Sequence, residues 1–259
     1  MVPPLKIIVV ILILVFLSAC PARSRQSQVD REHQLAAIID LGLVALKTGD
    51  YAKALVSFNE ANRLSPNNPD VLHHIGRTYF QLGEFEKAIE YYNTALALDP
   101  TKTDIHNNLG ILYMSIKDFD KAKMEFQYCI DDHTYGNSDM SRYNMGLLEE
   151  SQGRMDLAKN YYQQLISSDS VLIQMAYYRM GFLYSKEQDY RTSLDYLSLA
   201  VRMNPDYTDA YFLMGEVLEK LGNNDEAAEA YGRCVTLEPN SMRGIEAQRR
   251  VRAIMHEYK

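Results

Sequence analysis

Hydrophobic and polar positions alternate along most of this chain with the spacing of an α-helix, and the helical stretches occur in pairs. Residues 72–100 contain one such pair, whose apolar faces are formed by Leu72, Ile75 and Tyr79 and then by Ala88, Tyr92 and Ala95. Gly83 lies between the two faces, where glycine favours a turn. Pro100 disfavours helical geometry at Asp99, so we expect the second helix to end there. The pattern predicts two antiparallel helices joined by a short turn.

The pair of helices repeats along the chain. A first-helix glycine recurs at spacings of 34, 34, 36, 35 and 34 residues, as Gly42, Gly76, Gly110, Gly146, Gly181 and Gly215. A small residue of the second helix recurs as Ala54, Ala88, Ala122, Ala158, Ser193 and Ala227. A proline follows the second helix as Pro66, Pro100, Pro205 and Pro239, with Thr134 and Ser170 in its place in the two middle units. We expect each glycine and its small partner to lie where the helices cross, because a larger side chain would overpack that crossing.

Glycine, alanine and proline in this register resemble the tetratricopeptide repeat (TPR). The resemblance implies an all-α, right-handed superhelical solenoid of six TPR helix pairs within residues 34–241. The expected repeats are 35–68, 69–102, 103–136, 139–172, 174–207 and 208–241. The first repeat is expected to bury Ile38, Leu41, Tyr51, Ala54, Phe58 and Ala61. Residues 242–259 are predicted to form a capping helix that covers the last apolar face with Ile245, Val251 and Ile254.

Composition and charge narrow the possible functions. The chain has 259 residues, of which 47% are hydrophobic and 24% charged, a composition typical of folded proteins. The formal net charge is −7, and no Lys/Arg run interleaved with aromatic residues occurs, which argues against a broad nucleic-acid-binding surface. The densest basic segment, Arg243 to Arg252, is expected to form a solvated end face of the last helix.

The N-terminal segment resembles a bacterial lipoprotein leader. Lys6 precedes an apolar run from Ile7 to Leu17, which is short for a membrane span and suits a signal peptide over residues 1–19. Leu17-Ser18-Ala19-Cys20 resembles the lipobox, which implies cleavage before Cys20 and attachment of acyl chains such as palmitate to that residue. For lipoproteins of a Gram-negative envelope, the resemblance implies that Pro21 after the cysteine, in place of aspartate, favours delivery to the outer membrane, so the protein would face the periplasm. Residues 20–33 are polar and predict a tether; the alternative is an uncut membrane anchor.

The sequence contains no arrangement typical of an active site. Cys129 and Cys234 occupy equivalent small positions three repeats apart, too far for a disulfide, and are expected to be buried. The six histidines show no metal-ligand spacing, and neighbouring His73 and His74 face different sides of a helix. Carboxylates are scattered, mainly on the outer faces of second helices. We therefore predict a protein that is not an enzyme, with no catalytic residues, cofactor or metal.

In TPR folds the first helices line a concave groove. The positions that would line it here carry Asn107, Ile111, Met114, Met140, Tyr143, Leu147, Met175, Tyr178 and Phe182. A groove of Met and aromatic residues suits an apolar strand or an amphipathic helix from a partner protein. At Glu216 and Glu219 the lining becomes acidic. The alternative interpretation is that several of these side chains pack on the adjacent repeat.

An acylated cysteine, a tether and six regular TPRs resemble the pilotin lipoproteins of type IV pilus systems (the PilF/PilW/Tgl type). The more particular resemblance is Asn107-Asn108-Leu109-Gly110 and the expanded junction from His133 to Arg142. The family implies a non-catalytic protein, lipid-anchored in the outer membrane, that assists assembly of a secretin. Two alternatives stay open: a BamD-like lipoprotein of outer-membrane β-barrel insertion and an NlpI-like adaptor for peptidoglycan enzymes.

Overall fold

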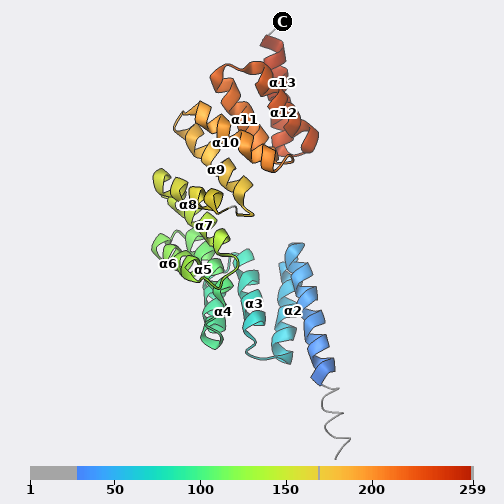
Figure 1. Ribbon diagram of the computed structural model, residues 1–259. Coiled ribbons are helices and arrows are strands. Elements are labelled where there is room, and N and C mark those ends of the chain that lie inside the picture. Colours follow the sequence, from blue (N-terminus) through green and yellow to red (C-terminus); the bar gives the residue numbers. More distant parts are fainter. Residues whose placement is uncertain (1–27, 169, 258–259) are drawn as a thin grey trace, which may run out of the picture. The chain divides into compact units, whose positions relative to one another are not determined.

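The structure of the chain is a computed structural model that describes residues 28–168 and 170–257 (Figure 1). Within these residues the secondary structure consists of helices and turns, without a strand, so the predicted all-α class is confirmed. The proposed signal peptide (residues 1–19) and Cys20 lie outside the described residues. Residues 28–33, assigned above to the tether, belong to the first helix, which covers residues 28–47.

The helices follow one another along the chain with short turns between them. After residues 28–47 they are α2 (Tyr51–Leu64), α3 (Pro69–Gln81), α4 (Phe85–Leu98), α5 (Thr103–Ser115), α6 (Phe119–Asp131), α7 (Ser138–Ser151), α8 (Met155–Ser167), α9 (Ile173–Lys186), α10 (Tyr190–Met203), α11 (Thr208–Leu221), α12 (Asn224–Leu237) and α13 (Met242–Glu257). They form two compact units, the first ending at Leu112 and the second beginning at Tyr113, so the division falls within α5.

Local sequence signals set the helix ends. The Asn68 side chain accepts hydrogen bonds from the backbone N–H groups of Asp70 (2.9 Å) and Val71 (3.3 Å), while Pro69 occupies the first helical position of α3. Gly83, in the turn between α3 and α4, has φ of 77°, a left-handed conformation that glycine adopts without a steric penalty. Helix α4 ends at Leu98, in agreement with the prediction from Pro100.

The recurrent glycines lie where paired helices cross, as predicted. A Cβ atom added to Gly76 would lie 2.7 Å from the Tyr92 ring, and one added to Gly146 would lie 2.5 Å from the Tyr162 ring. In the fifth pair, Ser193 replaces the usual alanine, and its buried hydroxyl donates a 2.7 Å hydrogen bond to the Gly181 carbonyl. At Gly42, Gly76, Gly146, Gly181 and Gly215 the crossing therefore depends on the absence of a side chain opposite a large one.

Replacing Gly146 with alanine is expected to lower the free energy of unfolding by about 1–3 kcal/mol, because the Tyr162 ring leaves no room for a methyl group. Urea denaturation followed by far-UV circular dichroism measures the change. Gly232→Ala in α12 is the matched control, since a Cβ at Gly232 meets no atom within 4 Å. The control should gain about 0.5–1 kcal/mol from helix propensity, and a similar gain for Gly146→Ala would contradict the argument.

The first unit buries a core between its first helix, α2 and α3. Phe58 and Ile75 are fully buried in this cluster together with Ala45, Ala54, Ala61 and Val71. Ile38 packs against the cluster, but the prediction for Leu41 is wrong, since this side chain is 56% exposed. Val44, on the same face of the first helix as Leu41, is 62% exposed.

In the second unit the core continues from α7 to α13 through a series of adjoining clusters. Ala247 and Ile254 of α13 are buried against α12, so α13 covers the last apolar face as expected. The prediction for Ile245 is wrong, because this side chain is 48% exposed. At about 100° per residue, Ile245 lies roughly opposite Ala247 and Ile254 on the helix.

Candidate partner-binding groove

The predicted groove residues divide between the two units. In the first unit, Asn107 is buried in α5 and Ile111 is half-buried. In the second unit, Met114 is half-buried at the end of α5, and Met140 at the start of α7 is 39% exposed. The remaining candidates lie on α7 and α9 of the second unit.

The structure brings the α7 and α9 candidates together. Tyr143, Leu147, Met175 and Phe182 contribute to one cluster, and Tyr178 and Phe182 contribute to the next. Tyr143 is only 9% exposed, with its ring centroid 5.8 Å from that of Tyr162. Tyr143 therefore packs on neighbouring helices, which agrees with the alternative interpretation that several predicted groove side chains pack on the adjacent repeat. Met140 and Phe182 leave more of their surface available to a partner.

Aromatic rings beside the α9 helix add to this apolar surface. The Tyr178 ring lies 5.1 Å from the ring of Tyr207, which precedes α11. Burial raises the pKa of Tyr178 and of Tyr143, so both hydroxyls stay protonated at neutral pH. The Phe182 ring is approached by the cations of Arg179 at 5.0 Å and Lys186 at 5.2 Å. The α9 part of the groove is thus apolar with positive charge beside it.

A largely buried ion pair joins α7 and α9 next to these side chains. Arg179 donates to both carboxylate oxygens of Glu150, with the Nε–Oε2 distance at 3.1 Å, and the Tyr162 hydroxyl donates to Oε2 at the same distance. The side chains of Arg179 and Glu150 are 20% and 11% exposed. Burial works against the charge of Arg179, but the hydrogen bonds and the charge of Glu150 outweigh it and raise its pKa.

A second carboxylate on α7, that of Glu149, is not solvated, although the sequence predicted solvated acidic residues. Glu149 is fully buried, receives a hydrogen bond from Arg154, and has its Oε1 atom 3.4 Å from Nζ of Lys123. Burial opposes its ionisation, yet the hydrogen bond from Arg154 and the charges of Lys123 and Arg154 lower its pKa below the ordinary value. Glu149 thus ties α7 to α6 and to the following turn.

The C-terminal part of this face is formed by α9, α11 and α13. A cavity of about 300 Å³ is lined there by Phe182, Lys186, Glu216, Glu219 and Arg250. Burial raises the pKa of Glu216, and Arg250 Nη1 lies 3.1 Å from an oxygen of Glu219. The acidic lining expected from the sequence is therefore partly neutralised by α13.

The basic residues of α13 do more than form a solvated end face. Arg243 pairs with Asp209, and its guanidinium lies 5.1 Å from the centre of the Phe212 ring. Arg250 contacts Glu219 as described above. These contacts were not predicted from the sequence, although Arg243 follows its partner Asp209 by one repeat length, 34 residues.

The described residues contain no group of histidine, cysteine and acidic side chains that could hold a metal ion. Cys129 and Cys234 are both buried, as expected from the sequence, and burial raises the pKa of the Cys234 thiol to about 11. His73 is buried, with Asn108 Nδ2 at 2.6 Å from its Nε2 and Asp104 at 3.3 Å from its Nδ1. Among the helices described, none combines the length and apolar character needed to cross a membrane.

Comparison with known families identifies the repeats. Tetratricopeptide-repeat models match residues 45–94, 103–131, 141–171, 176–207 and 208–241, and a further TPR model matches residues 76–116. The chain is a tetratricopeptide-repeat protein. The predicted TPR solenoid class is thereby confirmed. Over 62 residues this TPR protein is also 34% identical to an uncharacterized protein of Methanocaldococcus jannaschii, which corresponds to 24% of this chain and 72% of that protein.

Solved structures show the same fold. The TPR protein resembles PilF of Pseudomonas aeruginosa with a TM-score of 0.66 and 23% identity, over 85% of this chain and 98% of PilF. It resembles PilW, a type IV pilus biogenesis factor, with a TM-score of 0.69 and 20% identity, over 83% of this chain and 98% of PilW. Yeast Tom70 gives a TM-score of 0.72 at 17% identity, but only 47% of Tom70 is covered. Since all three identities are below 25%, these likenesses show the fold alone.

Proposed function

We propose that this TPR protein is a non-catalytic scaffold of type IV pilus biogenesis, anchored by lipid in the outer membrane and facing the periplasm. It binds a segment of the secretin and assists its assembly. The observation that supports this proposal is the extent of the structural match: PilF and PilW are each covered over 98% of their length. Tom70 is covered over 47%, so the likeness to Tom70 concerns the repeat, whereas the likeness to PilF and PilW extends along the whole of those chains.

The proposed binding surface in the second unit consists of Met140, Tyr178 and Phe182 with the side chains around them. Its chemistry suits an apolar strand or an amphipathic helix, since Met and aromatic side chains adapt to irregular apolar surfaces. The Arg179–Glu150 pair holds α7 and α9 in a fixed relation, which orders this surface before the partner arrives. An ordered surface loses less conformational entropy on binding. Asn107, Ile111 and Met114 stay predicted groove residues.

The proposed anchor is the acylated Cys20. Each buried methylene contributes about 0.8 kcal/mol, and two or three acyl chains are enough for stable attachment to a bilayer. The anchor would keep the bound secretin segment at the membrane where the secretin assembles. Replacing Cys20 with alanine should release the protein from outer-membrane fractions, and unchanged fractionation would contradict the anchor alone.

The binding proposal is tested by replacing Met140 with glutamate. We expect the variant to recover roughly tenfold less secretin than the wild type from detergent-solubilised envelopes, because a carboxylate is costly to bury against an apolar segment. Met140 is 39% exposed, so the fold should tolerate the change. Met124→Glu in α6, at a position 72% exposed, is the matched control and should recover secretin normally. Assembled secretin multimers in the same strains provide the second readout.

Two outcomes would contradict different parts of the proposal. Equal recovery of secretin by Met140→Glu and Met124→Glu would place the binding surface elsewhere on the chain. Recovery of β-barrel assembly proteins or peptidoglycan enzymes in place of secretin would overturn the pilus function and favour one of the two alternative envelope roles.

A further inference from the structure

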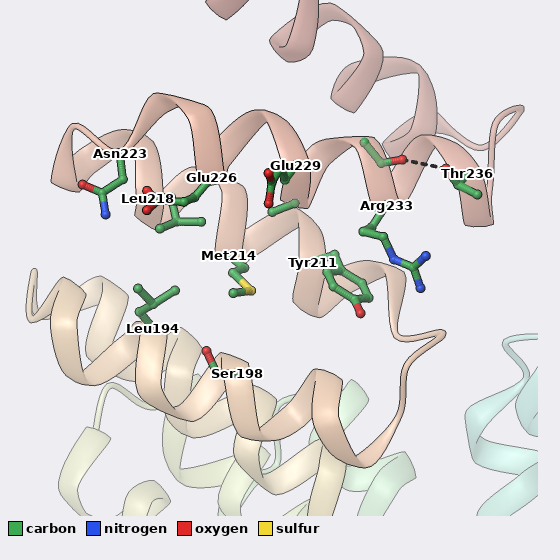
Figure 2. A pocket seen from close by; sticks show the side chains of 12 residues that line it. Leu194, Ser198, Tyr211, Met214, Leu218, Asn223, Glu226, Glu229, Arg233 and Thr236 are labelled. Carbon is green, nitrogen blue, oxygen red and sulfur yellow. Dashed lines mark hydrogen bonds between the residues drawn. The ribbon is translucent and has the colours of Figure 1, made fainter.

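The second unit has another groove, formed by second helices and separate from the surface considered above. It is an open groove between α10 and α12, with α11 as its floor and a volume of about 770 Å³ (Figure 2). This volume is within the range of sites that bind ligands or peptide side chains. None of the groove residues proposed above lines it.

The floor of this groove is apolar. Met214 and Leu194 are half-buried and contact both adjoining core clusters, and Leu218 is almost fully buried. Figure 2 shows the Met214 side chain pointing into the space between α11 and α10, with Leu194 and Ser198 on the opposite wall. The half-buried Tyr211 ring continues the floor toward the end of α12. A flexible methionine between aliphatic and aromatic side chains accommodates apolar groups of varied shape.

The wall formed by α12 carries separated charges of opposite sign. Glu226 and Glu229 lie one turn apart, and Arg233 lies one turn further, with its guanidinium 5.5 Å from the Tyr211 ring centre. All three side chains are exposed, and within the described parts of the chain none of them forms an ion pair. The groove is therefore acidic toward the start of α12 and basic toward its end.

We propose that this groove binds an amphipathic helical segment of a partner protein. The segment has an apolar face, a Lys or Arg that meets Glu226 and Glu229, and an acidic residue that meets Arg233. The spacing of the wall fits a helix: Glu226 and Arg233 are seven residues apart, roughly 10 Å along α12, which equals two turns of an aligned partner helix. A helix that places apolar side chains in a groove is a recurrent mode of peptide recognition.

The test uses three labelled helical peptides of about 14 residues, a length that spans roughly 20 Å, like the lining of α12 from Asn223 to Thr236. They share one apolar face and carry, seven residues apart, either one lysine and one glutamate, two lysines, or two glutamates. Binding to the full-length chain in phosphatidylcholine nanodiscs is measured by fluorescence anisotropy, with the signal of empty nanodiscs subtracted. The wild type should prefer the peptide with one lysine and one glutamate.

The decisive variant is Arg233→Glu, which makes the wall acidic throughout. It should weaken binding of the mixed peptide and strengthen binding of the dilysine peptide, each by roughly fivefold to tenfold, so the preference changes. Arg202→Glu in α10, an exposed position outside the groove, is the matched control and should leave the preference unchanged. Ser198→Trp, at another exposed position, should fill the groove and abolish binding of all three peptides.

The proposal is overturned if none of the peptides binds the wild type, or if Arg233→Glu and Arg202→Glu show the same preference. Retention of binding by Ser198→Trp would equally exclude the groove as the site. Far-UV circular dichroism of each variant verifies that the helices are retained. This test involves no secretin, so its result is independent of the secretin binding proposed above.

Discussion

Replacing Arg179 with methionine is expected to lower the free energy of unfolding by about 3–5 kcal/mol. The substitution leaves the Glu150 carboxylate, whose side chain is 11% exposed, without its counter-ion, and among the described residues the Tyr162 hydroxyl is the one remaining donor. A carboxylate in this setting either stays charged at a high cost or takes up a proton. Methionine preserves much of the apolar stem of arginine, so loss of packing contributes little to the expected effect.

Urea denaturation of the full chain, followed by far-UV circular dichroism, measures this loss; the chain contains no tryptophan to serve as a fluorescent probe. Arg249→Met is the matched control, because Arg249 pairs with Glu246 on the surface and is 75% exposed. Its loss should cost about 0–1 kcal/mol. Equal effects of the two substitutions would show that the Arg179–Glu150 pair is hydrated and does not lock α7 to α9.

The double variant Glu150→Leu/Arg179→Met separates two quantities: the loss of stability caused by an unpaired Glu150 charge, and the net contribution of the ion pair to the free energy of unfolding. Replacing a buried ion pair by apolar residues is often neutral or stabilising, so most of the lost stability should return. If the double variant is as unstable as Arg179→Met, hydrogen bonding to Tyr162 and packing carry the effect. If it regains stability but recovers less secretin, the pair orders the binding surface without adding to stability.

The fold was predictable because its contacts are local in the sequence. Gly76 meets Tyr92 within one helix pair, and the same relation recurs as Gly146 with Tyr162. Because the glycine and the large side chain occupy the same positions in each repeat, the repeating sequence pattern predicts these contacts directly. Leu41 and Ile245 were misplaced because apolar character alone does not establish that a neighbouring element covers the residue; both lie on end helices, which have fewer neighbours.

The candidate site was predictable only in part. The position of a residue within the repeat predicted which apolar residues lie on the first helices. It did not distinguish Tyr143, which packs inward, from Met140, which stays exposed. It also gave no signal that Glu150 pairs with Arg179, 29 residues later, since the two occupy different repeat positions. Side-chain pairing between repeats depends on rotamers and on the distance between helices, and both require coordinates.

The first unit is expected to lose stability between about pH 6.5 and pH 4 because of two adjacent histidines. Burial is the main cause that lowers the pKa of His73 and of His74 to about 4, and Arg77 acts in the same direction on both rings. His74 stacks on Phe58 at 5.3 Å and on His73 at 5.5 Å, so the expectation that the two histidines face different sides of the helix is wrong. Asp70 and Asp104 favour the protonated rings, but their attraction does not offset burial.

The sign of the pH effect follows from which state binds the proton first. In the unfolded chain a histidine has a pKa near 6.5, so below that pH the unfolded state binds protons that the folded state does not bind. The full stability is therefore present above about pH 6.5 and falls as the pH is lowered toward 4, by about 2–3 kcal/mol for each ring.

Urea midpoints measured along this pH range should show the decline. The variant His73→Gln/His74→Gln should have a flatter profile, whereas His133→Gln, at an exposed position, should keep the slope of the wild type. A wild-type slope in the double variant would assign the acid lability to other groups.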